Sequence, residues 1–353
     1  MNPNQYTCKN CGGKVVFDVQ TQNLRCPNCE TEYPITKQEA NTKHLISDYD
    51  TVEKPTEHTA SVIVCSSCGA TIEFDTHVTS GKCPYCASPV VLSEKAVTSL
   101  PPDGICPFKI DKHEAESRFR KWIKGKWFAP NALKNLYQSG KIMGVYVPYW
   151  IFDADADCKY QADGGKDRRV EYQVNGEKKT RIETDWYPVS GTIAHRFKDK
   201  IVRATKSITD HLLRILGGFN LKNAFSFHAD FFTGFSSEIF NIPIHDAYKE
   251  AQEYFKGVLH SMVESKVRLT YDRVRNVRLW IQWSNEYYRF MFLPVYTMAY
   301  YFKGKTYQVL INGDSGHIVG DYPKSFWKIF FVVLAILIVL GLLYYFFEVR
   351  PLS

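Results

Sequence analysis

Eight of the ten cysteines form two sets of four with identical spacing. In each set, two Cys-x-x-Cys pairs are separated by fourteen residues. This spacing lets two tight turns bring four thiolates to one tetrahedral metal ion, as in a zinc ribbon. The predicted ligands are Cys8, Cys11, Cys26 and Cys29 in the first set, and Cys65, Cys68, Cys83 and Cys86 in the second. We therefore expect two zinc ions in two small β ribbons, because segments of about 30 residues need a metal to fold.

The two sets also match each other residue by residue at an offset of 57 positions. Cys11-Gly12 corresponds to Cys68-Gly69, and Phe17-Asp18 corresponds to Phe74-Asp75, which indicates an internal duplication. The alternatives are a disulfide framework, which needs an oxidising compartment, and a rubredoxin-like iron site. The two remaining cysteines, Cys106 and Cys158, are expected to be inert thiols.

The stretch Ile329–Phe347 contains nineteen residues and no charge. As a helix it would be about 28 Å long, close to the hydrocarbon thickness of a bilayer. We predict a single transmembrane helix over residues 326–347, which makes the protein tail-anchored. A buried core helix is the alternative.

Three features predict that the N-terminal body lies in the cytoplasm, at the cell membrane. The first residues, MNPNQYTCKN, lack the apolar core of a signal peptide. Lys324 and Lys328 precede the terminal helix while only Arg350 follows it, which agrees with the positive-inside rule. Free thiolates for zinc need a reducing compartment.

Charge is distributed unevenly along the chain. Residues 1–100 contain 8 basic and 11 acidic residues, whereas the remainder contains 36 and 26. A zinc ion with four thiolates adds a charge of about −2, so the ribbons are more acidic still. Because nucleic-acid affinity depends on phosphate contacts by Lys and Arg, the ribbons favour a protein partner, with nucleic acid as the alternative. The basic remainder suits contact with anionic lipid at the membrane.

The segment Lys112–Trp127 has the spacing of an amphipathic helix. Ala115, Phe119, Trp122 and Ile123 share its apolar face. Its cations could contact lipid headgroups or phosphates: Arg118, Arg120, Lys121, Lys124 and Lys126. The simpler alternative is a helix docked on a sheet with a solvated basic face.

The rest of the middle region predicts a β-rich α+β fold. We expect a strand over Val145–Ala162, a helix over Ile244–Val263 and a meander from Val277 to Ile311. Connections are expected at Gly164–Asn175, at Asn175-Gly176 and at Ser284–Glu286. The predicted division is a first ribbon at 1–36, a polar linker at 37–60, a second ribbon at 61–95, an α+β cytoplasmic domain at 100–323 and the transmembrane helix at 326–347. The polar linker is expected to be a flexible tether or one short helix.

No catalytic motif is present in the sequence, and we expect no enzymatic activity. Asp153, Asp155 and Asp157 resemble the start of a calcium loop. However, Cys158 stands where that loop needs glycine and Gly164 where it needs glutamate, so exposed acidic side chains are expected instead.

The paired ribbons, the motif Val145–Phe152 (VYVPYWIF), the run Tyr307–Gly320 and the terminal helix together resemble a family of Gram-positive zinc-ribbon membrane proteins, the YdjG-like group. Its members are often labelled TFIIB-type zinc ribbon-containing proteins. The resemblance implies that the eight paired cysteines are metal ligands, and it implies no catalytic residue. The family's setting beside SPFH-domain (flotillin-like) and phage-shock-like proteins implies a partner of such a kind and a role in membrane organisation or envelope stress.

Two functions follow as hypotheses. The first is an adaptor or scaffold whose zinc ribbons bind protein partners at the cytoplasmic membrane face. The alternative is a membrane-tethered nucleic-acid-binding protein associated with transcription or replication.

Overall fold

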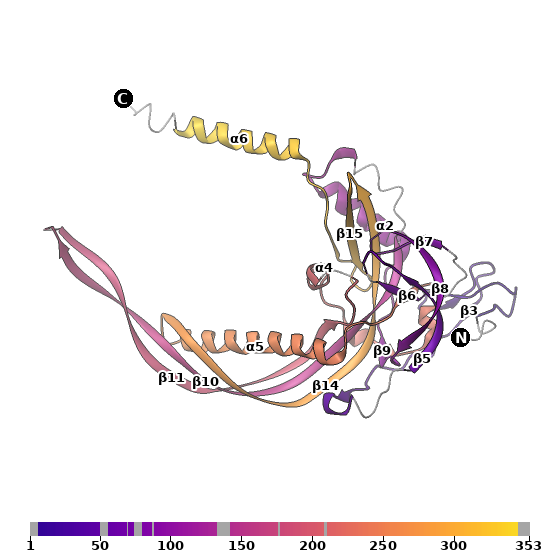
Figure 1. Cartoon of the computed structure of the whole chain (residues 1–353), viewed down its shortest axis with the longest axis horizontal. Coiled ribbons are helices and arrows are strands. Elements are labelled where there is room, and N and C mark those ends of the chain that lie inside the picture. The colour runs from indigo at the N-terminus through magenta and orange to yellow at the C-terminus, as the bar shows by residue number, and fades with distance from the viewer. Residues whose placement is uncertain are drawn as a thin grey trace.

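The computed structural model of the chain describes residues 6–49, 56–68, 70–73, 80–86, 88–132, 142–175, 177–207 and 210–344. It confirms the predicted fold class: two N-terminal four-cysteine clusters with small antiparallel strands, a large β-rich middle and one C-terminal apolar helix. A compact body carries two projections on the same side, a long curved β arm and the terminal helix α6 (Figure 1).

Three very long strands connect the body to the arm. Strand β10 (Met143–Val174) pairs antiparallel with β14 (Arg273–Phe302) on one side. On its other side β10 pairs with β11 (Glu177–Arg203) as far as the tip of the arm. They belong to a 13-stranded sheet whose other strands are short and lie in the body.

Two of the expected connections, Gly164–Asn175 and Ser284–Glu286, are wrong because they fall inside strands. Gly164 lies inside β10, and an added Cβ there would come within 2.5 Å of the Tyr271 ring, so this glycine permits ring packing rather than a turn. Asn285 lies inside β14 with a φ of 51°, next to a register shift at Asp153/Asp155, so it marks a β-bulge. Asn175, with a φ of 54°, is at the arm's tip, and the expected turn residue Gly176 lies outside the described residues.

In the body, both faces of the sheet are covered. Every residue from Val145 to Phe152 is buried, and so is every residue from Tyr288 to Met298. Alternate side chains enter two different cores: Tyr146 and Trp150 join one, and Val147 joins the other. The Trp150 indole is fully buried and donates a hydrogen bond to the Ile242 carbonyl (3.0 Å). These nearly continuous apolar runs, which only Arg289 and Thr297 interrupt, are the pattern of strands buried on both faces.

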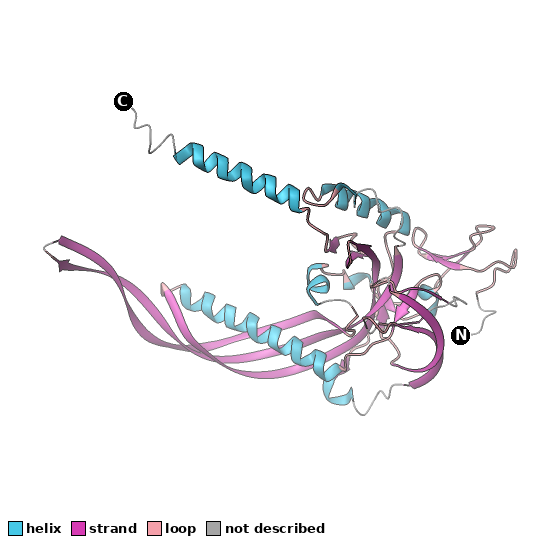
Figure 2. Cartoon of the chain, turned by 45° about the horizontal axis from the view of Figure 1, so that its top comes forward, coloured by secondary structure: helices cyan, strands magenta, loops and turns pink. Residues whose placement is uncertain are grey.

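In the arm, the helix α5 (Ile244–Arg268) covers one face of the three strands (Figure 2). Its buried side includes Ala251, Phe255, Leu259 and Val263. Along β10 buried and exposed residues therefore alternate from Ala156 to Ala162, as expected for a sheet with one solvated face. Beyond Gly165 neither β14 nor α5 follows, and β10 and β11 continue as a two-stranded ribbon.

The remaining elements are short. The first ribbon forms its own three-stranded sheet, and the second ribbon joins the large sheet because β6 pairs with β13 of the body. Their bounds are β1 Val16–Asp18, β2 Asn23–Arg25, β3 Glu32–Tyr33, β4 His44–Leu45, η1 Ile46–Asp48, β5 Thr56–Val64, β6 Thr71–Glu73, β7 Ser80–Lys82, β8 Pro89–Ser99, β9 Gly104–Ile105, α2 Lys112–Gly125, α4 Asp210–Ile215, η3 Leu221–Asn223, β12 Phe225–Ser226, η4 Ala229–Phe232, β13 Ser236–Glu238, β15 Lys305–Asn312 and β16 Ile318–Gly320.

Residues 37–49 of the predicted linker are not a flexible tether. The Lys43 ammonium is bonded to the Asp153 carboxylate, and His44 Nε2 lies 2.6 Å from an Asp103 carboxylate oxygen. Asp153 is thus buried rather than exposed, and it also accepts a hydrogen bond from the Asp199 backbone N–H. Polar composition predicted a tether here because the long-range ion pairs that hold the segment are invisible locally. We call residues 37–49 the strap.

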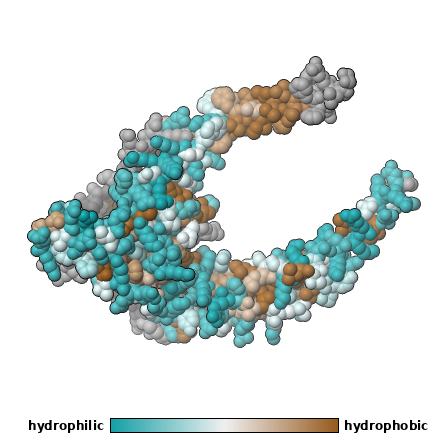
Figure 3. All heavy atoms as spheres, turned by 180° about the vertical axis from the view of Figure 1, so that it is seen from behind, coloured by the Kyte–Doolittle hydropathy of each residue, from teal (hydrophilic) through white to brown (hydrophobic). Residues whose placement is uncertain are grey.

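The terminal helix α6 spans Phe326–Tyr344 with a mean hydropathy of 2.8, and none of this stretch is buried against the body. Figure 3 shows its uniformly apolar surface against the mostly polar arm and body. It is long and apolar enough to cross a membrane, and residues 345–347 of the predicted span lie outside the described residues. At its start, Lys328 Nζ donates to the carbonyls of Trp127 (3.0 Å) and Ala129 (2.9 Å).

We predict that deletion of residues 326–353 moves the protein from the membrane fraction to the soluble fraction. No residue in the described part of α6 is buried, and only Lys328 at its start is bonded to the body, so the truncated chain should keep its fold. Fractionation followed by immunoblotting measures the change, and circular dichroism of the truncated chain provides the folding control. Retention of the truncated protein on membranes would show that another surface holds it there.

Candidate metal centres

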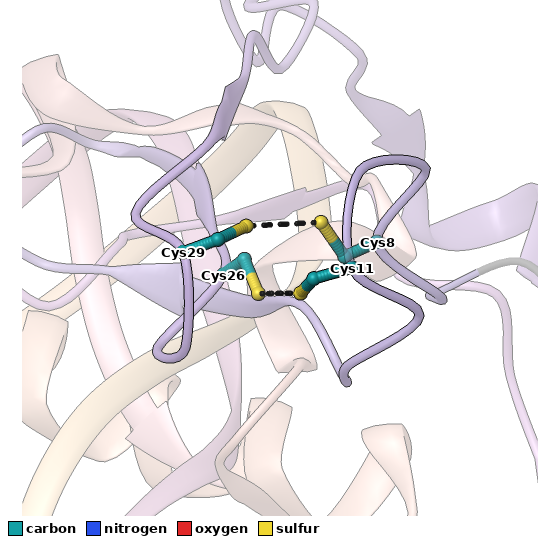
Figure 4. Close-up of side chains that lie close together, drawn as sticks. All are labelled: Cys8, Cys11, Cys26 and Cys29. Atoms are coloured by element: carbon teal, nitrogen blue, oxygen red, sulfur yellow. Dashed lines mark hydrogen bonds between the residues drawn. The ribbon is translucent and has the colours of Figure 1, made fainter.

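The first cluster brings together the thiols of Cys8, Cys11, Cys26 and Cys29, whose sulfur atoms all lie within 4.8 Å of one another. Figure 4 shows the two Cys-x-x-Cys turns facing each other with the four side chains directed to one centre. The Cys8–Cys29 and Cys11–Cys26 sulfur distances are 3.5 and 3.4 Å. A tetrahedral four-thiolate zinc with bonds of about 2.3 Å needs sulfur separations of about 3.8 Å. Small adjustments would therefore accommodate the ion.

The second cluster has the same arrangement. Cys65, Cys68, Cys83 and Cys86 also lie within 4.8 Å of one another, with sulfur distances of 3.4 Å for Cys65–Cys86 and 3.7 Å for Cys68–Cys83. Each cluster could hold one metal ion, which is consistent with the two zinc ions predicted from the spacing. Phe74, the counterpart of Phe17 in the duplication, lies outside the described residues.

Neighbouring hydroxyls favour the thiolate form in the first cluster. The Tyr33 hydroxyl lies 3.3 Å from Cys8 Sγ and lowers the pKa of that thiol. The Thr31 hydroxyl lies 3.2 Å from Cys29 Sγ and, with the Thr31 backbone, lowers the pKa of Cys29 to about 6. Because zinc binds thiolates and not thiols, these groups favour metal binding by Cys8 and Cys29. In contrast, burial raises the pKa of Cys106 to about 12, which agrees with an inert thiol.

The first ribbon is attached to the body by the side opposite its cysteine turns. Phe17 packs edge-on against Phe231, with ring centroids 5.3 Å apart, and the Gln22 amide donates to the Phe108 carbonyl (2.8 Å). The cysteine turns themselves face solvent. The residues that they expose are Lys9, Asn10, Cys11, Gly12, Pro27 and Asn28.

The second ribbon is built into the body through one of its cysteine turns. Pro84 and Tyr85, between Cys83 and Cys86, are buried. The Tyr85 hydroxyl donates to the Glu238 carboxylate (2.8 Å), and the Thr297 hydroxyl donates to the Pro84 carbonyl (3.0 Å). The two clusters are thus alike in sequence but differ in their surroundings.

Glu238 provides the buried carboxylate of this contact. It is 1% exposed, and it accepts hydrogen bonds from the hydroxyls of Tyr85, Thr205 and Ser207. Burial raises its pKa to about 7 even though these hydrogen bonds oppose the shift. Sequence reasoning missed Glu238, since Tyr85 lies 153 positions away and no local pattern links the two.

The basic helix forms as predicted, and its cations have individual surroundings. α2 begins at Lys112, where the Asp111 carboxylate caps the Glu114 N–H, and ends at Gly125, so the predicted Trp127 lies just beyond it. Arg118 is paired with Glu114 (2.7 Å), and the Lys126 ammonium lies over the Trp122 ring (4.8 Å). The other three cations are exposed on the helix: Arg120, Lys121 and Lys124. Nothing in this arrangement selects lipid over phosphate.

Together, the two cysteine clusters and α6 fit a membrane-anchored zinc-binding protein with a β-rich body. The sequence is similar to the uncharacterized protein YdjG of Bacillus subtilis, with 26% identity over 326 residues that cover 92% of this chain and 91% of the relative. The resemblance to a YdjG-like protein is therefore confirmed along nearly the whole chain. No family model and no solved structure matches it.

We predict unequal consequences when one ligand of each cluster is replaced. Cys26→Ser and Cys83→Ser should each leave one zinc per chain by elemental analysis, because each cluster holds one ion. Only Cys83→Ser should markedly lower the urea midpoint for unfolding of the body. The reason is that only the second cluster has a cysteine turn buried in the body. Equal midpoints for the two variants would contradict this difference.

Tyr85→Phe should destabilise the protein by about 1–3 kcal/mol, because it leaves a buried carboxylate with one fewer donor. The zinc content should stay unchanged, since no metal ligand is altered. Urea denaturation gives the free energy of unfolding, and Tyr187→Phe, at an exposed position of the arm, is the matched control. A loss of the same size in both variants would argue against the Glu238 contact.

Proposed function

We propose that this membrane-anchored zinc-binding protein is a tail-anchored adaptor that holds a protein partner at the cytoplasmic face of the cell membrane. The first ribbon provides the partner-binding surface, and the second ribbon is structural. A partner of the SPFH-domain or phage-shock-like kind, and a role in membrane organisation or envelope stress, fit the family setting.

The exposure of both cysteine turns in the first ribbon carries this proposal. A metal centre that only stabilised the fold could be covered by the body. In the second ribbon, one of the two cysteine turns is covered in this way. The first ribbon instead offers two adjoining turns to solvent. It also lies at the end of the body away from the side where α6 projects (Figure 1), so a membrane around α6 leaves it accessible.

Lipid contact by α2 is a further part of the proposal. The loop that follows α2 is bonded to the start of α6 through Lys328, so the last cations of α2 lie near the point where the chain would enter the bilayer. Lys121, Lys124 and Lys126 can then meet anionic headgroups, while Trp127, which is 58% exposed, suits the interface region.

Nucleic acid is the second candidate, and the charges on the first ribbon disfavour it. Arg25 is paired with Asp18 (3.3 Å) and Glu30 (2.8 Å), so its charge is already compensated. Lys9 is the exposed cation on the cysteine turns. Phosphate-driven binding needs several unpaired cations on one surface.

Site-specific photocrosslinking in native membranes tests the proposal. A benzophenone amino acid at Asn28, on an exposed turn of the first ribbon, should capture one defined protein. The same probe at Gln173, near the arm's tip, is the control and should not capture it. Capture should disappear when Cys26→Ser removes the metal, because the turn then loses its shape.

Crosslinks from Asn28 that contain nucleic acid instead of protein would favour the alternative. Identical protein capture from Asn28 and Gln173 would reject a ribbon-specific partner site.

A further inference from the structure

The strand β11 has a free edge along the arm. It pairs with β10 on one side, and no strand in the described part of the chain pairs with its other side. From Val189 to Phe197 its register with β10 is unbroken, so the ladder there is regular. An unpaired edge presents a row of N–H and C=O groups that can accept an additional strand.

Two observations define which groups point outward. Lys266 of α5 donates to the Thr192 carbonyl (3.0 Å) from the open side, so the polar backbone groups of Thr192 point away from β10. By alternation, those of Ser190 and Ala194 do the same. Pro188 occupies another position of this set, where its missing N–H costs no hydrogen bond to β10.

A shallow hollow of about 600 Å³ lies on α5 and is lined by Tyr254, Gly257, Val258, Ser261, Met262 and Ser265. Tyr254, Val258, Met262 and Lys266 are spaced four apart and form one ridge of the helix. Both ends of this ridge contact β11, since the Lys200 ammonium lies 3.6 Å from the Tyr254 ring centroid and Lys266 reaches Thr192. The hollow therefore borders the free edge of β11.

Positive charge lies beside the edge. Between Pro188 and Arg203 the chain carries Arg196, Lys198, Lys200 and Arg203 and a single acid, Asp199, which is bonded to Arg289. Arg196 is paired with Asp155 of β10 (2.8 Å) and Arg203 is half-buried. Lys198 and Lys200, with Lys266 of α5, therefore supply the positive charge along the edge. An approaching strand would thus meet apolar side chains on the α5 face and positive charge around the edge.

We propose that β11 and the adjoining ridge of α5 bind an extended acidic segment of a partner protein by strand addition. The segment's backbone pairs with Ser190, Thr192 and Ala194. Its apolar side chains alternate with acidic ones and pack against Val258 and Met262. This site is separate from both cysteine clusters and does not depend on the ribbon function proposed above.

A second copy of this chain is the competing occupant. In an antiparallel pairing of two β11 edges centred on Ala194, Arg196 of one copy would face Thr192 of the other, and Lys198 would face Ser190. This register brings no like charges together. Self-association is therefore an outcome that the test must separate from peptide binding.

The test uses the full chain in nanodiscs of zwitterionic lipid and a short fluorescent peptide that alternates valine and aspartate. Fluorescence anisotropy should show binding to the wild-type protein. Ala194→Pro removes an outward N–H without touching the β10 ladder, and it should weaken binding at least about tenfold, or about 1.4 kcal/mol. Ala194→Ser, which keeps the N–H, is the matched control and should bind like the wild type.

A second variant on a different element keeps the test independent of strand folding. Met262→Glu should weaken binding of the acidic peptide by a similar factor, whereas Met262→Leu should leave its binding unchanged. Hydrogen exchange should slow at Ser190, Thr192 and Ala194 when the peptide is bound. A peptide that alternates valine and lysine should bind less well.

The proposal is overturned if the acidic peptide fails to bind at about 1 mM, if Ala194→Pro and Ala194→Ser bind equally, or if the lysine peptide binds better. Dimerisation that Ala194→Pro abolishes and the peptide cannot compete would assign the edge to a second copy instead. Because none of these variants alters a cysteine, the result is independent of crosslinking at the first ribbon.

Discussion

The antiparallel ladder between β10 and β14 is the constraint on which the rest of the structure depends. A sheet is stable only where its apolar side chains are covered, and this ladder passes through regions with different covers. In the body, two cores cover both faces and the strand sequences are mostly apolar. In the arm, α5 covers one face and the sequences alternate. Beyond Gly165 of β10, neither β14 nor the covering helix α5 continues. The remaining β10–β11 ribbon carries mostly exposed residues.

The duplicated cysteine clusters show how one motif serves two purposes in a single chain. Metal binding supplies folding free energy to both. For the second cluster that energy reaches the body, because Tyr85 and Pro84 are inserted beside Glu238 and Thr297. For the first, contacts at Phe17 and Gln22 attach the ribbon by its strands and leave the metal turns open. The difference arises from the partners each copy meets and not from the cysteine spacing.

Features encoded in local patterns were predictable. The cysteine spacing placed the clusters, the apolar periodicities placed α2 and α5, and the uncharged run placed α6. The extent of β10 was not predictable, because Gly164 and Gly165 resemble a turn until Tyr271 is seen packed on the backbone. The strap was missed for a similar reason, since Lys43 finds Asp153 more than a hundred positions away.

The shared direction of the arm and α6 limits how the protein can meet a bilayer. Both project from the same side of the body, and the arm extends beyond the described end of α6 (Figure 1). The arm carries charged pairs along its length, such as Arg168–Glu183 and Arg273–Asp167, and hydrocarbon excludes such groups. A flat membrane lying square across α6 would cut through the arm. Any bilayer that α6 crosses must therefore leave the arm outside its hydrocarbon, and this requirement constrains the angle between the helix and the arm.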